Sequence, residues 1–427
     1  MFQAFLLAAA ALSSALAENV SYHEHSVLSC MPQDRAQLDV LHNLEVKSDL
    51  KLDFWKEARR VGSSVDVMPF PKDLAAFRAI MDENKIKCET MIENVQIAVD
   101  SEKKHKSTKG TLRGSATPYF EAYHDSTEVH AFMDDLATEF PSLASTSVFG
   151  STYEGRPMQL LTISTAPGTG KKALWFDGGL HAREWIAVTT MTYLADALVR
   201  GYGSNDDATY MLDNFDILIA PILNVDGYDY TWAEDGDRMW RKTRSPNSNS
   251  RCVGTDPNRN WEFHWGEAGT STQPCSDSYE GAFAASEVEV QHVQNYLYDN
   301  KDTLEGYINF HSYSQEWMSP WGYTDEVPAQ PDYGLQNGVS EAATAAIKAV
   351  HNKEYIYGPI ATTIYPASGS SADYTYGVCG IVYSYGVELR DTGKNGFILP
   401  AEEIIPQGEE IFAGVVAMGK YIAEHSR

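Results

Sequence analysis

Short apolar segments alternate with longer amphipathic segments over most of this chain, and that alternation constrains the fold more than any other feature. The apolar segments are typical of buried strands and cover 173–177, 215–222, 306–310 and 378–389. Apolar residues recur at helical spacing over 127–139, 184–200, 286–300 and 338–351, and again after Pro406, over 407–425. Strands that alternate with helices form layered α/β folds. We therefore predict a mixed, largely parallel central sheet with helices on both faces.

Charge is distributed unevenly along the 427 residues, whose formal net charge is −26. Residues 18–113 contain 15 Lys and Arg against 16 Asp and Glu, whereas residues 114–427 contain 18 against 43. Two segments with such different surfaces indicate two units. The acidic excess also excludes nucleic acid and anionic membrane surfaces as partners, because both are bound through clustered Lys and Arg.

The first 17 residues have the pattern of a secretory signal peptide, although a buried N-terminal helix is the alternative. An apolar core leads to Ala15-Leu16-Ala17, which predicts cleavage after Ala17 and a secreted, extracellular protein. Asn19-Val20-Ser21 is an acceptor sequence for N-glycosylation, and the sequence leaves its use open. No later apolar run is long enough to span a bilayer, so we expect no membrane partner.

A basic segment over 103–114 separates the two units that the charge distribution indicates. Such a Lys-rich, Gly- and Ser-containing run predicts an exposed linker and a site of proteolysis; a solvated helix face is the alternative. Before it, the residues around 74–81 have helical spacing, whereas 65–68 and 91–99 are strand-like. This organisation favours a propeptide over 18–113 and a mature domain over 114–427.

The five cysteines fit a secreted chain. Cys252 and Cys275 lie in a polar, Ser-rich segment and are the expected disulfide. Cys379 lies in an apolar run, which predicts a buried free thiol. Cys30 and Cys88 could pair, but the sequence does not decide it.

Histidines follow two of the predicted strands. His181 comes after the strand 173–177, with Glu184 three positions later, and His311 ends the strand 306–310. Binding sites in open α/β sheets form at the carboxyl ends of strands, so these side chains could meet in one site. Two histidines and a carboxylate suit zinc and leave one position for water. The spacing alone is a weak signal, and structural roles remain the alternative.

Two further segments contain charged residues that could take part in catalysis or ligand binding. Glu388 ends an apolar strand and is either a paired structural charge or a catalytic base. Five basic residues fall close together in a domain poor in them: Arg241, Lys242, Arg244, Arg251 and Arg259. Clustered guanidinium groups imply an anionic ligand, since they bind carboxylates with two hydrogen bonds. Pairing with surface acidic groups is the alternative.

Taken together, these segments resemble the secreted zinc metallocarboxypeptidases of the A/B type (carboxypeptidase A-like), made as preproenzymes. Residues 34–100 resemble the pro-domain of that family. The matching motifs of the second unit are His-Ala-Arg-Glu-Trp-Ile at 181, Trp-Arg-Lys-Thr-Arg-Ser at 240, Asn-Arg-Asn-Trp at 258, His-Ser-Tyr-Ser-Gln at 311, Ile-Tyr-Pro-Ala-Ser-Gly at 364 and Glu-Leu-Arg-Asp-Thr-Gly at 388. The resemblance implies the zinc carboxypeptidase fold, preceded by a small α+β pro-domain built as an antiparallel open sandwich.

The resemblance also implies roles for the residues that match. His181, Glu184 and His311 would bind one Zn²⁺ per catalytic domain, Glu388 would be the general base, and Arg244 would stabilise the oxyanion. The residues implied to bind substrate are Arg183, Asn258, Arg259, Ser312, Tyr313 and Tyr365. Among these, the clamp for the terminal carboxylate is expected from Asn258, Arg259 and Tyr365. The resemblance assigns the family's disulfide to Cys252 and Cys275.

Specificity depends on the side-chain pocket. Ala372 is small and apolar at the position where B-type enzymes carry an Asp, while Asp373 matches a residue that both subtypes have. A charged side chain would be desolvated there without a partner, so the resemblance implies an A-type enzyme. Gly386 leaves room for Phe, Tyr, Trp or Leu. A B-type or broad-specificity enzyme is the first alternative, and a non-catalytic binding protein on this scaffold is the second.

Several partners follow from the same resemblance. We expect substrates to be peptides or proteins with a free C-terminus, and the propeptide to inhibit its own catalytic domain. A trypsin-like protease would activate the zymogen by cleavage near Arg113. The enzyme is expected to be a monomer.

Overall fold

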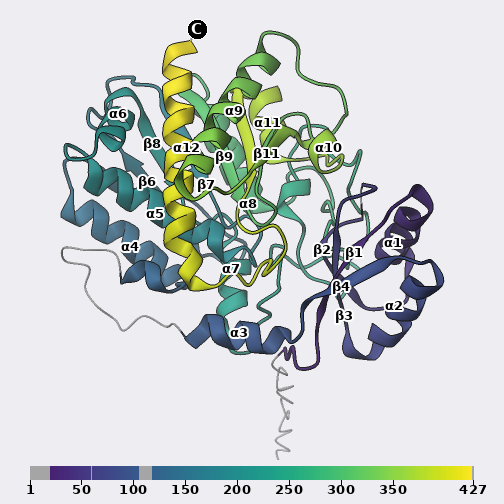
Figure 1. The fold of residues 1–427 in the computed structure, drawn as a ribbon. Coiled ribbons are helices and arrows are strands. Elements are labelled where there is room, and N and C mark those ends of the chain that lie inside the picture. Colours follow the sequence, from purple (N-terminus) through teal and green to yellow (C-terminus); the bar gives the residue numbers. More distant parts are fainter. Residues whose placement is uncertain (1–19, 59, 105–117, 426–427) are drawn as a thin grey trace, which may run out of the picture.

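The computed structural model describes residues 20–58, 60–104 and 118–425 (Figure 1). The predicted signal peptide over 1–17, the acceptor Asn19 and the predicted cleavage site near Arg113 lie outside these residues. The described helices include none that is long and apolar enough to cross a membrane.

The N-terminal unit is a four-stranded antiparallel sheet with two helices on one face. The strand order is β2-β3-β1-β4. Its elements are β1 (Val27–Met31), α1 (Arg35–Lys47), β2 (Leu52–Lys56), β3 (Val65–Pro69), α2 (Pro71–Glu83), β4 (Lys87–Ile92) and α3 (Val95–Lys104). This is the predicted α+β open sandwich. The predicted strand over 91–99 is mostly wrong, because β4 ends at Ile92 and Val95 begins a helix.

Alternation along the strands gives this small sheet two apolar faces. Leu28 and Val67 pack against α1 and α2. Their neighbours Val27 and Met68 point the other way, into a cluster that contains Phe397 of the larger unit. Each unit therefore buries apolar surface of the other, and in Figure 1 the small sheet lies against one edge of the larger unit.

The larger unit is built on an eight-stranded mixed sheet in the order β11-β10-β12-β9-β7-β8-β6-β5. The four central strands β12, β9, β7 and β8 are parallel. The strands are β5 (Ala144–Ser151), β6 (Pro157–Ile163), β7 (Ala173–Asp177), β8 (Asp216–Ala220), β9 (Leu304–His311), β10 (Glu316–Ser319), β11 (Ile356–Pro359) and β12 (Tyr383–Glu388). The predicted strand over 378–389 is shorter than expected, since a helix ends at Gly377, residues 378–382 form a turn and a bend, and β12 begins at Tyr383.

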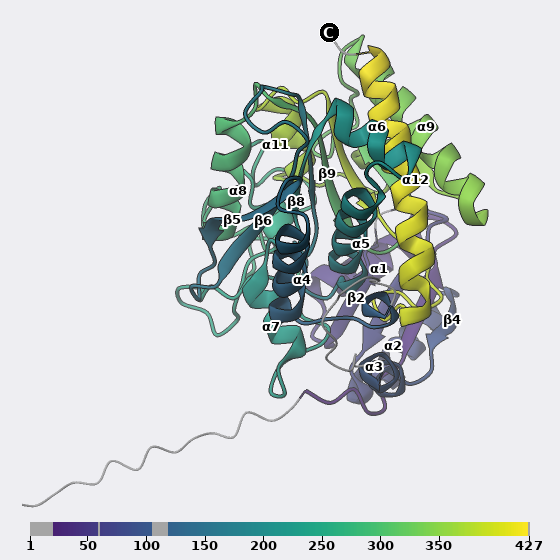
Figure 2. The same ribbon diagram turned by 90° about the vertical axis from the view of Figure 1, so that its left-hand side faces the viewer.

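Helices cover both faces of this sheet (Figure 2). One face packs against α4 (Ser126–Glu139), α5 (Trp185–Gly201), α9 (Asp332–His351) and α12 (Ile404–His425). The other packs against α8 (Val288–Asp299) and α11 (Ser371–Gly377). The remaining helices are short: α6 (Asp206–Asn214), α7 (Val225–Trp232), α10 (Ile360–Thr363), η1 (Tyr119–Glu121), η2 (Pro257–Arg259) and η3 (Ala401–Glu403). The predicted architecture is thus confirmed.

Two disulfides stabilise the units. Cys252–Cys275 forms as predicted, and Cys379 is free and buried. Cys30–Cys88, which the sequence left open, joins directly opposite residues of β1 and β4. The N-terminal unit is therefore cross-linked through its sheet.

We expect the double variant Cys30→Ala/Cys88→Ala to lower the free energy of unfolding of the N-terminal unit by about 4 kcal/mol, because the bridge closes a loop between residues 58 positions apart. Pulse proteolysis of the full chain in urea would follow the loss of the N-terminal unit and so measure the change in its free energy of unfolding. The variant Cys379→Ala controls for the removal of a thiol. An unchanged midpoint in the double variant would contradict the expectation.

Candidate active site

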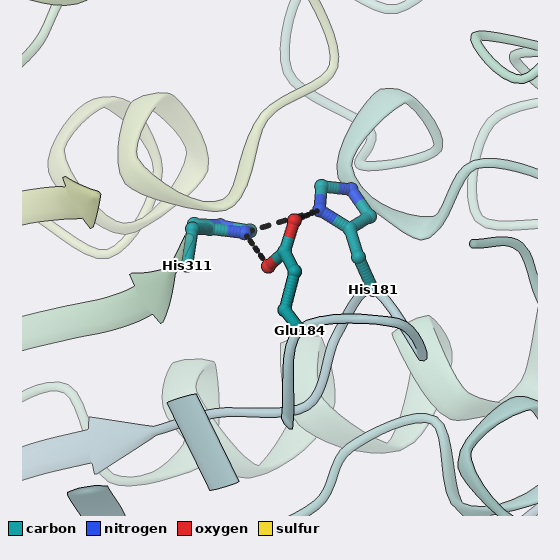
Figure 3. Close-up of side chains that lie close together, drawn as sticks. All are labelled: His181, Glu184 and His311. Atoms are coloured by element: carbon teal, nitrogen blue, oxygen red, sulfur yellow. Dashed lines mark hydrogen bonds and ion pairs between the residues drawn. The ribbon is translucent and has the colours of Figure 1, made fainter. Parts of the chain in front are cut away.

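Three side chains of the metal-binding type meet where β7 and β9 end (Figure 3). His181 lies in the loop after β7, Glu184 directly precedes α5, and His311 ends β9. All three are buried, and their ligand atoms lie within 4.8 Å of one another. Since β7 and β9 are adjacent and parallel, their carboxyl ends lie at the same edge of the sheet.

A glycine allows the loop after β7 to turn tightly before His181. Gly179 has a φ of +61°, which favours glycine. A Cβ there would lie 2.9 Å from Cγ2 of Val188 in α5, so the loop can pass this close to the helix only without a side chain. Gly179 therefore serves the geometry of the site.

The atoms of the cluster are arranged as zinc ligands. Nδ1 of His181 is 2.9 Å from Oε1 of Glu184, and Nδ1 of His311 is 3.0 Å from Oε2 of the same carboxylate. The two Nδ1 atoms are 3.1 Å apart. Two imidazole nitrogens and a carboxylate that converge on one point fit Zn²⁺, and three protein ligands leave a position for water, as in catalytic sites.

Asp256 orients one of these ligands. Its Oδ1 lies 3.0 Å from Nε2 of His181, the ring nitrogen that faces away from the cluster. A proton held there leaves Nδ1 free to bind metal. Burial opposes ionisation of Asp256, but Arg241 and His181 hold the pKa of this carboxyl well below its usual value.

We expect Asp256→Asn to weaken zinc binding about 10- to 100-fold, the usual effect of removing such a partner. Competition with a chelator would measure the affinity. Asp196→Asn is a matched control, because Asp196 pairs with Arg200 in α5, far from the cluster in the fold. Equal zinc affinity of the Asp256 variant and the wild type would contradict the orienting role.

A cavity of about 330 Å³ joins the metal cluster to most of the other predicted site residues. The predicted residues that line it are His181, Arg183, Glu184, Asn258, Arg259, His311, Ser312, Tyr313, Tyr365, Ala372, Gly386 and Glu388. Segments separated by up to about two hundred residues in sequence thus meet in one space.

Arg244 is the exception, and its predicted position at the oxyanion is wrong. Its guanidinium lies over the rings of Tyr230 and Trp240, 3.7 and 4.5 Å from their centroids. Arg241 lines the cavity instead, with Nη1 4.0 Å from Oε1 of Glu184 and Nη2 2.9 Å from Oδ2 of Asp256. Both arginines belong to the same motif, three positions apart, and the motif alone does not tell which one faces inward.

Arg259 is held in place at the cavity wall. Its Nε donates to the carbonyl of Gly269 (2.9 Å), and its Nη2 lies 3.4 Å from the hydroxyl of Tyr365. Asn258 Oδ1 accepts a hydrogen bond from the amide of Ser371 (3.0 Å). A fixed guanidinium with an amide and a phenol beside it can bind a carboxylate.

Glu388 ends β12 directly beside His311, its partner in the parallel pairing with β9. Its Oε2 is buried, with no hydrogen-bond partner among the residues that the structure describes. Burial, together with the nearby carboxylates of Glu184 and Glu316, raises its pKa well above the usual value. A carboxyl of this kind binds a proton readily.

One end of the cavity is an apolar pocket. Met318, Ile360 and Ala372 form a buried cluster there. Gly386 lies opposite Met318 in the pairing of β10 and β12, and a Cβ at Gly386 would meet no atom within 4 Å. Asp373 is occupied elsewhere, because its carboxylate accepts hydrogen bonds from the amides of Gly322 and Tyr323.

Two sets of residues that line the cavity could not be predicted as site residues from the sequence. The sequence marks Arg241 only as a member of a basic cluster, and it does not predict β10, the strand that contains Glu316. The N-terminal unit contributes Phe54, Trp55, Lys56, Glu57, Arg60, Ser63 and Ser64. No local pattern marks these residues as facing the site, since the contact spans two units.

Comparison with known proteins agrees with this geometry. Residues 129–414 match the zinc carboxypeptidase family, and residues 28–102 match the carboxypeptidase activation peptide. The chain therefore belongs to the zinc carboxypeptidase family, with an activation peptide, and is a metallocarboxypeptidase whose metal is zinc.

Individual relatives span nearly the whole chain. Carboxypeptidase A1 of Rattus norvegicus is 40% identical over 422 residues, which is 98% of this chain and 99% of the relative. Carboxypeptidase B of Astacus astacus is 44% identical over 304 residues, 71% of this chain and 98% of the relative. The crystal structure of thrombin activatable fibrinolysis inhibitor superposes with a TM-score of 0.86 at 32% identity, covering 94% of this chain and all of that one.

Proposed function

We propose that this chain is the secreted zymogen of an A-type carboxypeptidase, which removes aromatic or bulky aliphatic residues from the C-terminus of peptides. One observation carries the proposal. A single cavity contains the zinc cluster, the buried carboxyl of Glu388, the fixed guanidinium of Arg259 and an apolar pocket. These are the parts that hydrolysis of a terminal peptide bond requires.

Glu388 and Arg241 each have a step in this reaction. When bound, zinc would polarise the scissile carbonyl and lower the pKa of a water molecule at the site. Glu388 accepts a proton from that water as its oxygen bonds to the carbonyl carbon, and then delivers the proton to the nitrogen as the C–N bond breaks. Arg241 donates hydrogen bonds to the oxygen that gains negative charge. The raised pKa of Glu388 makes its ionised carboxylate a stronger base.

The carboxylate clamp restricts the enzyme to chain ends. Arg259 would bind the terminal carboxylate with two hydrogen bonds, aided by Asn258 and Tyr365. An internal peptide bond has no terminal carboxylate beside it for the clamp to bind, so internal bonds would not be cleaved. The side chain of the terminal residue enters the apolar pocket, whose size at Gly386 admits large groups.

Contacts between the N-terminal unit and cavity residues support the proposal that the chain is a zymogen. Asp53 accepts a hydrogen bond from Nη1 of Arg183 (3.1 Å), and Asp66 accepts one from the hydroxyl of Tyr313 (2.7 Å). Both partners are predicted substrate residues, so a bound propeptide competes with substrate. Release would follow cleavage near Arg113 by a trypsin-like protease, and the mature enzyme would act as a monomer outside the cell.

Activation followed by a substrate panel tests this proposal. The purified zymogen is treated with trypsin, the trypsin is inhibited, and peptides ending in Phe, Trp, Leu, Lys or Arg are supplied. We expect fastest release of Phe, Trp or Leu, and little release before activation. Preferential release of Lys or Arg would favour the B-type alternative, and a zinc-loaded chain that releases nothing would favour a binding protein.

A further inference from the structure

Glu316 is a buried carboxylate in the cavity that the proposed hydrolysis does not use. It is the first residue of β10, is only 5% exposed and lines the cavity wall. Its Oε2 has no hydrogen-bond partner within the described part of the chain. A buried carboxylate oxygen without a hydrogen-bond partner is costly, so a cationic group that donates a hydrogen bond to it would be bound with a gain in free energy.

The sheet register places Glu316 relative to the substrate. In the antiparallel pairing of β10 with β12, Glu316 lies opposite Glu388, and Met318 lies opposite Gly386. Residues two apart in a strand share a face, so Glu316 and Met318 both face the cavity. Met318 belongs to the apolar pocket that takes the terminal side chain. Glu316 instead lies level with Glu388, where the scissile bond must lie, and therefore next to the penultimate residue.

The N-terminal unit places cations beside this carboxylate. Lys56 and Arg60 line the same cavity. Burial raises the pKa of Glu316 to about 7, and these two cations act in the opposite direction. Arg60 also donates a hydrogen bond to the carbonyl of Thr363 (3.5 Å). Removal of the propeptide takes both cations away and leaves the carboxylate open to a cation of the substrate.

We propose that Glu316 gives the activated enzyme a preference for Lys or Arg at the penultimate position of its substrates. The proposal rests on the proposed carboxypeptidase function. A penultimate Lys or Arg would supply the positive charge that Lys56 and Arg60 supply in the zymogen, whereas a penultimate Asp or Glu would be repelled by Glu316. The terminal residue would still be selected by the apolar pocket.

Peptides that differ at a single position test the preference. Three peptides share a terminal Phe and carry Lys, Met or Glu before it, and kcat/KM is measured for each after activation and inhibition of trypsin. We expect the wild type to prefer Lys over Met by about tenfold and to disfavour Glu. Glu316→Gln should bring the Lys-to-Met ratio close to one, and Glu316→Lys should favour the peptide with Glu.

Glu289→Gln is the matched control, because Glu289 is another buried glutamate with an unpartnered Oε2, but it lies in α8 outside the cavity. Its Lys-to-Met ratio should equal that of the wild type. Each ratio is measured within one variant, so a lower yield of folded enzyme does not affect it. An unchanged ratio in Glu316→Gln would overturn the preference and leave the hydrolytic function intact. Failure of the wild type to cleave any of the three peptides would overturn both.

Discussion

Glu388→Gln should lower kcat by about 10²- to 10⁴-fold, the contribution of a positioned general acid–base group. The amide has the same shape but cannot take a proton from water or return one to the leaving amine. Because Glu388 is not part of the cluster formed by His181, Glu184 and His311, zinc content should remain unchanged.

Turnover of a peptide ending in Phe, measured together with zinc content, checks this expectation. Glu289→Gln again serves as the control, since it makes the same substitution at a buried site away from the cavity. If Glu388→Gln retained turnover within a few-fold of the wild type, Glu388 would not be the base and the proposed mechanism would fail.

The second large effect distinguishes Arg241 from Arg244, two arginines of one motif. Arg241→Ala should lower kcat by about 10²- to 10³-fold, the usual loss when one oxyanion donor is removed. Arg244→Ala should have little effect on kcat, because Arg244 lies over Tyr230 and Trp240. A change in KM alone would indicate that Arg241 only binds substrate.

Arg241 also pairs with Asp256, so its removal could disturb the zinc ligand His181 indirectly. Zinc content distinguishes the two effects: the oxyanion role predicts a loss of kcat in enzyme that is still fully loaded with zinc. The opposite result, in which Arg244→Ala is the damaging variant, would contradict the positions that the structure gives these two residues.

The central part of the fold could be predicted from sequence because its signals are local. The strands β7 and β9 are largely apolar and almost entirely buried, and the helix patterns between them have clear spacing. The edge strands could not be found in this way. β5, for example, mixes exposed and buried residues without a regular pattern, so its place in the sheet depends on its pairing with β6.

The same distinction between local signals and tertiary packing applies to the site. His181 and Glu184 lie three positions apart after one strand, and His311 ends another, so topology alone brings them to one edge of the sheet. The contact between Asp53 and Arg183, by contrast, joins residues 130 positions apart in different units. The cavity-facing positions of Arg241 and Glu316 likewise depend on how loops and strands pack, which no motif encodes.

The proposed function requires that this cavity cleaves only the last peptide bond of a chain with a free carboxylate. Mass spectrometry of one peptide in two forms, a C-terminal acid and a C-terminal amide, tests it most directly after activation. We expect the acid to lose residues one at a time from its C-terminus and the amide to stay intact, because Arg259 has no carboxylate to bind. Cleavage of the amide at a comparable rate, or cleavage of internal bonds in either form, would contradict the proposed function.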